Sequence, residues 1–349
     1  MQSKLGLDST RLSGRPSRFG VLALVLWVAL CTPGCISSLA KHSDALSAAT
    51  TPVVDQAAAA YRAAVVLHDR QSDYEAFAKF DVTPPVYNPR EIQPLLSEKD
   101  LQVRLTVLAA LQCYAQSLVE ITKGTSSPAL DAASKSVGND LASLGNTLAP
   151  SAESVLGIVS AAAATTLTTV TTTSGTTTTT TSSSSSTPAP PITPEIRNGI
   201  GTAVDALAQF LISRKIKKEL PQKIKEMDPH LQSLCELFVK EIDLLKDQEQ
   251  RDYNYIINRQ TLFIRTTSTL NPEQRREEIM KLPEIVRQQR AGDEQLARLR
   301  ASIAKLALTH HALAADAQGN NPQSLTSKLA ELGAAGSQLG KFYSSLPAK

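Results

Sequence analysis

Two histidines stand side by side at His310 and His311. Imidazole is a common side chain for acid–base catalysis and for binding transition metals. Neighbouring residues of a helix point about 100° apart, so this pair cannot readily grip one ion from a single face. The other histidines, His42, His68 and His230, have no Cys, His or carboxylate residues at ligand spacing. We therefore expect no metal site, and we interpret His310 as a core or boundary histidine with satisfied hydrogen bonds.

Cys113 and Cys235 are the two cysteines in the body of the chain. In an oxidising compartment they could form a disulfide, but only if their Cα atoms come within about 7 Å. The sequence leaves open whether they pair or stay thiols. A catalytic cysteine needs a positioned base and an activating environment, and nothing near either residue in the sequence supplies one.

Motifs for nucleotide binding and for nucleophilic catalysis are also absent from the sequence. It contains neither a phosphate-binding glycine loop nor a Gly-x-Ser-x-Gly elbow. We therefore expect no catalytic, cofactor-binding or metal-binding residues, and the chain is interpreted as not being an enzyme.

The other two cysteines, Cys31 and Cys35, follow a short apolar segment near the N-terminus. Residues 1–18 are polar and basic, and residues 19–30 read FGVLALVLWVAL. A helix needs about 20 apolar residues to span a bilayer, so this segment is too short for a stable membrane anchor. A basic start, a short apolar middle and small residues after it are typical of a secretory signal peptide. We therefore predict a leader over residues 1–34.

The residues that end this leader, TPGC, resemble the lipobox of bacterial lipoproteins. In that motif a small residue, here Gly34, precedes the cysteine that becomes the acylated N-terminus. Thr32 and Pro33 replace the usual Leu and Ala or Ser. The resemblance implies that Cys35 carries lipid, and it covers only the leader.

The residues after Cys35 bear on location and on a competing cleavage site. Ile36 and Ser37 lack the aspartate that retains many lipoproteins at the inner membrane. The resemblance therefore implies an outer-membrane anchor with the protein facing the periplasm. Ordinary cleavage after SLA, which would make Lys41 the first residue, is the alternative left open.

Charge and composition exclude one class of partner and favour one fold class. The net charge of +3 is fully accounted for by the leader, which carries Lys4, Arg11, Arg15 and Arg18 against Asp8. A near-neutral mature chain is not expected to attract nucleic acid. Hydrophobic residues make up 42% of the chain but aromatic residues only 4%, and a core rich in Ala and Leu suits packed helices better than sheets.

Six Ser/Thr/Asp/Asn-Pro pairs have the form of helix starts. A polar N-cap residue followed by proline, whose fixed φ suits the first turn, is a common beginning of a helix. The prolines of these pairs are Pro52, Pro128, Pro194, Pro229, Pro272 and Pro322.

The second half of the chain has the clearest apolar spacing. Alternating steps of three and four residues predict a helix packed along another helix, and they join Leu296, Leu299, Ile303, Leu306, His310 and Leu313. The expected partner helix begins at Pro229 and carries Leu231, Leu234, Phe238, Ile242, Leu245, Ile256 and Phe263. We predict a long antiparallel hairpin over 229–317, with a short helix near 270–283 that Pro283 stops.

The fold class predicted is all-α, an elongated helical bundle. Residues 35–51 are expected to be a tether and residues 52–163 the N-terminal helices. Residues 164–192, rich in Thr and Ser, are expected to be a disordered linker because they can bury little apolar surface. Residues 193–349 are expected to be C-terminal helices that pack with the N-terminal ones into one bundle.

The function hypothesis is a lipid-anchored envelope protein with a non-enzymatic role as a scaffold, adaptor or inhibitor-like partner. Its expected partners are the membrane, reached through the lipid, and a protein that the sequence does not identify. No small-molecule substrate is inferred. The alternative is a helical membrane-perturbing protein, similar to pore-forming proteins, that inserts through the uncharged region 155–190.

Overall fold

The computed structural model describes residues 33–80, 93–125, 127–148, 167–173, 176–182, 194–213, 217–319 and 322–345. Residues 1–32, which form nearly all of the expected leader, lie outside the described residues, as do residues 149–166.

The described part of the chain is built from α-helices, as the all-α prediction expected, apart from one two-stranded hairpin described below. Its seven α-helices are α2 (Pro33–Phe80), α3 (Glu98–Lys123), α4 (Pro128–Leu148), α6 (Pro194–Ile212), α7 (Leu220–Thr266), α8 (Pro272–Asp316) and α9 (Pro322–Ser345). A short 3₁₀ helix, η3 (Lys217–Glu219), precedes α7.

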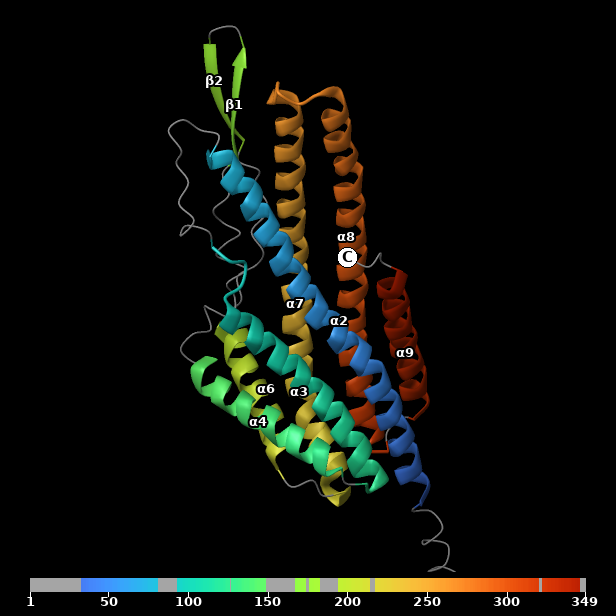
Figure 1. Cartoon of the computed structure of the whole chain (residues 1–349). Helices are drawn as coiled ribbons and strands as arrows, with labels where there is room; N and C mark the ends of the chain where they lie inside the picture. The colour runs from blue at the N-terminus through green and yellow to red at the C-terminus, as the bar shows by residue number, and fades with distance from the viewer. Residues whose placement is uncertain are drawn as a thin grey trace, which may run out of the picture.

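Helix α2 is the longest of the described helices, at 48 residues. Helices α7 and α8 run side by side in opposite directions and are joined by residues 267–271 (Figure 1). Helix α2 crosses this pair and also contacts α3 and α9. Helices α3, α4 and α6 pack together at one end of the α7–α8 pair (Figure 1). Segments from both halves of the sequence therefore share one set of packed helices.

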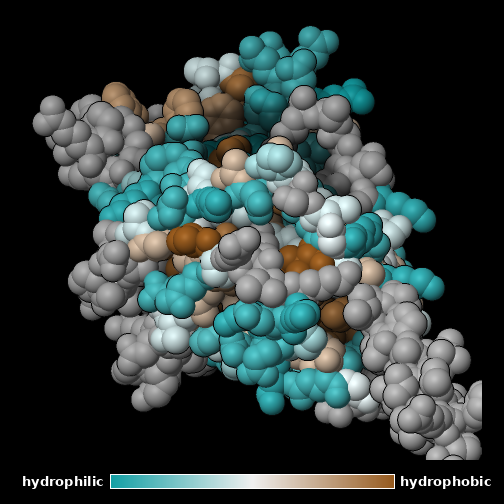
Figure 2. Space-filling model, turned by 90° about the horizontal axis from the view of Figure 1, so that it is seen from below, coloured by the Kyte–Doolittle hydropathy of each residue, from teal (hydrophilic) through white to brown (hydrophobic). Residues whose placement is uncertain are grey.

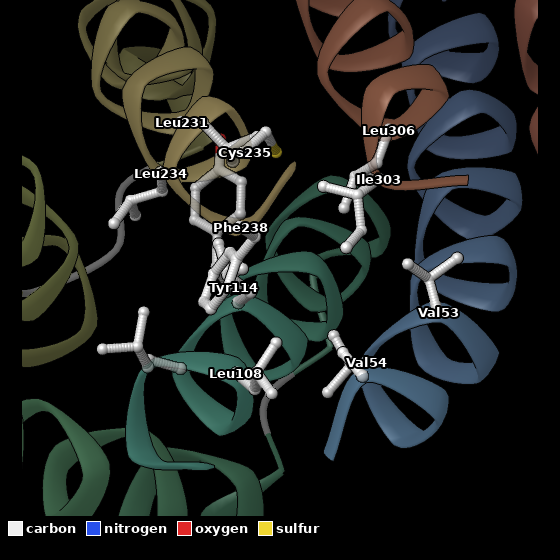
Figure 3. Close-up of a cluster of buried hydrophobic side chains, with 14 of the residues drawn as sticks. Val53, Val54, Leu108, Tyr114, Leu231, Leu234, Cys235, Phe238, Ile303 and Leu306 are labelled. Carbon is white, nitrogen blue, oxygen red and sulfur yellow. The ribbon is translucent and has the colours of Figure 1, made fainter. Parts of the chain in front are cut away.

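The main core lies where α2, α3, α7 and α8 meet. Figure 3 shows side chains from these four helices pointing toward one another, among them Val54, Leu108, Phe238 and Ile303. All six residues of the predicted 296–313 seam are buried. The predicted α7 face is also buried up to Ile256, but Phe263 is exposed and the neighbouring Ile264 is buried in its place.

Four of the six predicted helix starts are correct: Pro128, Pro194, Pro272 and Pro322 each begin a helix. The start at Pro272 has a full capping box, in which Asn271 accepts from the Gln274 backbone and Gln274 caps Asn271 in return.

Pro52 is not a helix start, and residues 35–51 are helical rather than a tether. Helix α2 runs continuously through Pro52. The hydroxyls of Thr50 and Thr51 donate to the carbonyls of Leu46 and Ser47, one turn earlier, instead of capping a new helix. Leu46 and Val53 are buried on either side, so core packing carries the helix through the proline.

Pro229 and Pro283 are also interior to helices, in α7 and α8. Asp228, expected to cap a helix, instead binds side chains of α8. The predicted short helix that Pro283 would stop is therefore wrong: α8 is continuous over 45 residues. Burial of Ile285 against Leu67 and Ile256 stabilises α8 just after this proline.

Helices α4 and α6 approach closely at Gly138. A Cβ atom at this position would lie 2.9 Å from Cγ1 of Ile212 and 3.2 Å from the carbonyl oxygen of Ala208. The absence of a side chain at Gly138 therefore sets the distance between the two helices.

Within the expected disordered linker, the structure has a two-stranded antiparallel hairpin. Strand β1 (Leu167–Thr173) pairs with β2 (Thr176–Ser182), with Leu167 opposite Ser182. Threonine is β-branched and favours extended backbone over helix. The hairpin projects beyond the helices in Figure 1, and the other residues of 164–192 lie outside the described residues.

The end of the molecule that holds α3, α4 and α6 has a largely hydrophilic surface. Figure 2 views this end, and its apolar residues form small separate areas between polar ones.

Candidate functional site

The carboxylate of Asp228 on α7 is the centre of the polar cluster that contains both neighbouring histidines. Nδ1 of His310 lies 2.9 Å from Oδ1, and Nδ1 of His311 lies 2.7 Å from Oδ2. The amide of Gln232 donates to Oδ1 at 3.2 Å and to the Ala307 carbonyl at 2.7 Å. The two histidines diverge from α8, but one carboxylate has two oxygens and reaches both.

The pKa of Asp228 reflects these contacts. Partial burial by itself raises the pKa of the carboxyl, but the hydrogen bonds from His310 and His311 outweigh it and lower the pKa to about 2. The carboxylate is therefore ionised at all physiological pH values.

The cluster continues into the core through His310, which is completely buried. Its Nε2 lies 2.8 Å from the hydroxyl of Tyr114 on α3, whose ring also packs edge-on against Phe210 of α6. Burial raises the pKa of Tyr114, and the Asp228 charge adds to the effect. The interpretation of His310 as a core histidine with satisfied hydrogen bonds is confirmed. Its contacts join α3, α7 and α8.

His311 is the part of the cluster that reaches the surface. When Nδ1 donates to Asp228, the lone pair of Nε2 is left to face outward, which is the arrangement of an Asp–His general base. A reaction would also require a nucleophile or substrate group near Nε2. Tyr114, the partner of His310, is buried, and with Asp228 it makes the inner part of the cluster a clamp between α3, α7 and α8.

A second buried cluster ties α2, α3 and α7 together. Nη2 of Arg104 lies 2.8 Å from Oε1 of Glu241, and the Tyr61 hydroxyl donates to Oε2 of the same carboxylate. The Arg104 guanidinium also donates to the Asp100 carbonyl and lies over the Tyr61 ring. Burial opposes the charge of Arg104, but the Glu241 carboxylate keeps the pKa of Arg104 above its usual value. Burial and the Glu241 charge together raise the pKa of Tyr61.

Histidine–aspartate contacts also join α2 to its neighbours. Nδ1 of His42 lies 3.0 Å from Oδ2 of Asp316 on α8, and Nδ1 of His68 lies 3.3 Å from Oδ2 of Asp252 on α7. With the Asp228 contacts, each pair among α2, α7 and α8 is linked by a histidine and an aspartate.

Cys113 and Cys235 are both thiols, and no disulfide joins them. Cys235 is buried on α7 beside Phe238 (Figure 3), whereas Cys113 is half-buried on α3. Burial raises the pKa of the Cys235 thiol to about 12, so it is almost entirely protonated and unreactive at neutral pH.

In the described ranges no group of three or more His, Cys, Asp or Glu side chains could hold a metal ion. The Asp228 cluster has the right residue types, but its imidazole Nδ1 atoms are directed at the carboxylate itself.

Cys35, the expected lipid site, lies on the backbone of the first turn of α2. The next turn of α2 contacts the bundle, because Leu39 packs against the core and Ser43 is buried. In Figure 1 this end of α2 lies opposite the α7–α8 loop.

Exposed apolar side chains gather at that opposite end. Tyr74 of α2 bonds Gln260 of α7, which bonds Glu278 of α8, so the three helices are in register there. Near these contacts each of the three helices carries two exposed apolar residues: Phe77 and Phe80 on α2, Leu262 and Phe263 on α7, and Ile279 and Met280 on α8. Phe77 is 74% exposed. We call these six residues the distal apolar group.

One described helix, α3, is long and apolar enough to cross a membrane. Half of that stretch is buried inside the bundle, as is usual for the core helix of a folded domain, so the test is weak evidence for a span.

The sequence pointed to His310, Cys113 and Cys235 but not to Asp228 or to the Arg104 cluster. The Asp-Pro pair favoured a cap rather than a contact with α8. A weak signal for the second cluster existed in Arg104, a cation between the apolar residues Val103 and Leu105 of α3.

Comparison with known proteins gives no relative. No family model, no curated protein and no solved structure matches this chain.

Proposed function

We propose that this chain is a lipid-anchored protein of the bacterial envelope, with a non-enzymatic role as a scaffold or adaptor. The anchor is the acylated Cys35, and the site implied by the lipobox-like TPGC is the outer membrane, with the helices in the periplasm.

The observation that best supports an anchor at Cys35 is the contact of Leu39 with the core. Cleavage before Cys35 removes only Pro33 and Gly34 from α2 and keeps Leu39. Cleavage after Ala40 would remove Leu39 and place the His42–Asp316 contact at the frayed chain end. The packing of α2 therefore favours Cys35 over Lys41 as the first residue.

Metabolic acyl labelling tests the anchor. In a bacterial host the wild-type protein is expected to incorporate labelled fatty acid and to fractionate with membranes. Cys35→Ser is expected to lose the label, while Cys31→Ser, in the segment removed with the leader, keeps it. Mass spectrometry of the N-terminal peptide reads the first residue directly. An unlabelled protein beginning at Lys41 would contradict the anchor.

The scaffold role is supported by the distal apolar group and by the nature of the buried polar clusters. Groups of exposed apolar side chains often mark interaction surfaces, and the distal apolar group lies at the end of the molecule away from Cys35. The Asp228 and Arg104 clusters join helices and offer no described site for a substrate, which fits a protein that binds rather than reacts.

Site-specific photocrosslinking in cells tests this role. A photoreactive residue at Phe77 or Met280 is expected to give a discrete crosslinked species. The same residue at Lys225, exposed near the start of α7, is the control and is expected to give none. Equal yields at all three positions would contradict a partner at the distal end.

Dye release from liposomes distinguishes the alternative, insertion through residues 155–190. The scaffold proposal expects no release by the purified protein. Release that disappears when 155–190 is deleted would favour the membrane-perturbing function.

A further inference from the structure

The distal half of α2 is held on α7 and α8 differently from the proximal half. In the described ranges a small apolar cluster joins the helices here: Leu67, Ile256 and Ile285 are buried, and Tyr74, Tyr253 and Ile257 pack half-buried against them. Beyond Leu67 polar contacts add to this packing, and they include Arg70 with Gln288 at 3.3 Å and Tyr74 with Gln260 at 3.2 Å. Segment 67–80 is therefore held by a small apolar cluster and by polar contacts, and the contact of His68 with Asp252 is one that titrates.

His68 has an acceptor at each ring nitrogen. Nδ1 faces the Asp252 carboxylate at 3.3 Å, and Nε2 lies 3.2 Å from the carbonyl oxygen of Gln93. A neutral imidazole has one N–H and can satisfy only one of these acceptors, whereas the imidazolium donates to both. The closed position of α2 therefore favours the protonated ring.

Glu249 lies one turn before Asp252 on α7 and is only 8% exposed. Its Oε2 occupies space next to Gly292 of α8, 2.9 Å from where a Cβ would be. No hydrogen bond reaches its carboxyl group from the part of the chain that the structure describes. Ionising a carboxyl group that is mostly removed from solvent and has no described donor is costly, so the closed packing favours the neutral acid.

Like charges around Glu249 act in the same direction. Asp293 of α8 and Asp252 of α7 lie close enough to raise its pKa, although burial is the larger cause, and the pKa reaches about 7. The charged and titratable groups facing this junction are His68, Asp69 and Arg70 from α2, Arg251, Asp252 and Tyr253 from α7, and Asp293 from α8.

We propose that the junction of α2, α7 and α8 around His68 and Glu249 is a pH-sensitive clasp. In mildly acidic medium the imidazolium and the neutral acid hold segment 67–80 on α7 and α8. Above neutral pH, His68 loses its second donor and the Glu249 carboxylate faces Asp252 and Asp293, so the segment opens. Opening uncovers Leu67, Ile256 and Ile285 next to the distal apolar group.

Both groups favour closure in acid. The pKa of His68 is raised in the closed form: burial opposes the charge, but the contacts with Asp252 outweigh it. The contribution of His68 is thus present below about pH 6.5 and lost as the pH rises through that raised pKa. The contribution of Glu249 is complete below its ordinary pKa of 4.5 and is lost as the pH rises to about 7.

Hydrogen exchange of the mature chain tests the clasp. After correction for intrinsic exchange rates, amides of 67–80 are expected to be at least about tenfold better protected at pH 5 than at pH 8, the effect of one pKa unit between closed and open forms. Peptides covering 231–245, in the main core, are the internal control and should not change.

Glu249→Gln provides the decisive variant, because the amide cannot ionise. Its protection of 67–80 at pH 8 is expected to rise to within about threefold of the wild-type value at pH 5. Glu236→Gln, at an exposed position of the same helix, should behave as wild type. Protection that does not depend on pH, or a Glu249→Gln protein with the wild-type dependence, would overturn the clasp.

Asp293→Asn covers the case in which Glu249→Gln does not fold. Removing the neighbouring charge lowers the cost of ionising Glu249, so the ratio of protection between pH 5 and pH 8 is expected to shrink. An unchanged ratio would refute the proposal equally.

Discussion

Arg104 is buried in α3, and the carboxylate of Glu241 on α7 balances its charge. Only 3% of the Arg104 side chain and 2% of the Glu241 side chain are exposed. Replacing such a pair with apolar residues is often harmless, but removing one partner leaves the other charge buried and uncompensated. The cluster is therefore sensitive to single substitutions.

Glu241→Ala is expected to lower the free energy of unfolding by about 3–5 kcal/mol, because Arg104 loses the carboxylate and Tyr61 loses its acceptor. Urea denaturation followed by circular dichroism measures the change. Glu236→Ala, which removes an exposed pair with Lys240, should stay within about 0.5 kcal/mol of wild type. Similar decreases in the free energy of unfolding for both variants would show that the buried pair stabilises the protein no more than the exposed pair does.

Asp228 gives a pH-dependent prediction. The pKa of Asp228, about 2, lies below the ordinary value of 3.8. Its contribution to the free energy of unfolding is therefore present above pH 3.8 and is lost as the pH falls through 2. Asp228→Asn is expected to cost about 1–2 kcal/mol at pH 7, allowing for solvent screening. The difference from wild type should narrow in urea titrations between pH 4 and pH 2.5, and a constant difference would contradict this assignment.

At the scale of the helix, the prolines mark the limit of sequence analysis. A local pattern of N-cap and proline predicts a start, and at Pro272 it is correct. At Pro52 and Pro229 the same pattern lies inside a helix, because apolar residues are buried on both sides of each proline: Leu46 and Val53 around Pro52, and Met227 and Leu231 around Pro229. Such burial depends on helices distant in the sequence, and a local pattern does not contain it.

Pro283→Ala is expected to stabilise the protein, by up to about 3 kcal/mol, because alanine restores a backbone hydrogen bond in α8 and removes a steric clash. Thermal unfolding gives the measurement. Pro272→Ala is the matched control at the first helical position, where proline costs nothing, and is expected to be neutral or slightly destabilising. A lower melting temperature for Pro283→Ala would mean that the proline itself shapes α8.

Gly138→Val is expected to destabilise the protein by about 1–3 kcal/mol, since the new side chain would press on Ile212 and on the α6 backbone. Gly333→Ala has open space at its Cβ position and should add about 0.5–1 kcal/mol through helix propensity. Chemical denaturation of both variants compares a contact effect with a propensity effect. Equal behaviour of the two would contradict close packing at Gly138.

At the scale of the molecule, composition and periodicity were sufficient for the all-α class and for most of the main core. They could not supply the polar clusters, because Asp228 meets His310 and Arg104 meets Glu241 across long sequence separations. Cysteine pairing was open for the same reason. The β-hairpin at 167–182 was not predicted either. The low apolar content of this segment indicated disorder, whereas the preference of threonine for extended backbone favours a strand.

The connection between α4 and α6 gives a prediction for the whole fold. Replacing residues 167–182 with a short Gly/Ser linker is expected to leave the melting temperature of the bundle unchanged or slightly raised, since a shorter loop costs less entropy to close. Differential scanning calorimetry measures it. A lower melting temperature would show that the hairpin supports the helices.

The course of α2 has a mechanical consequence. At 1.5 Å per residue its 48 residues extend about 70 Å, and it contacts α3, α7, α8 and α9 along the way. A force applied at its first turn would load these contacts in parallel, in shear, instead of peeling them apart one by one. A protein tethered at this turn would therefore resist tension through the contacts of α2 with all four of these helices together.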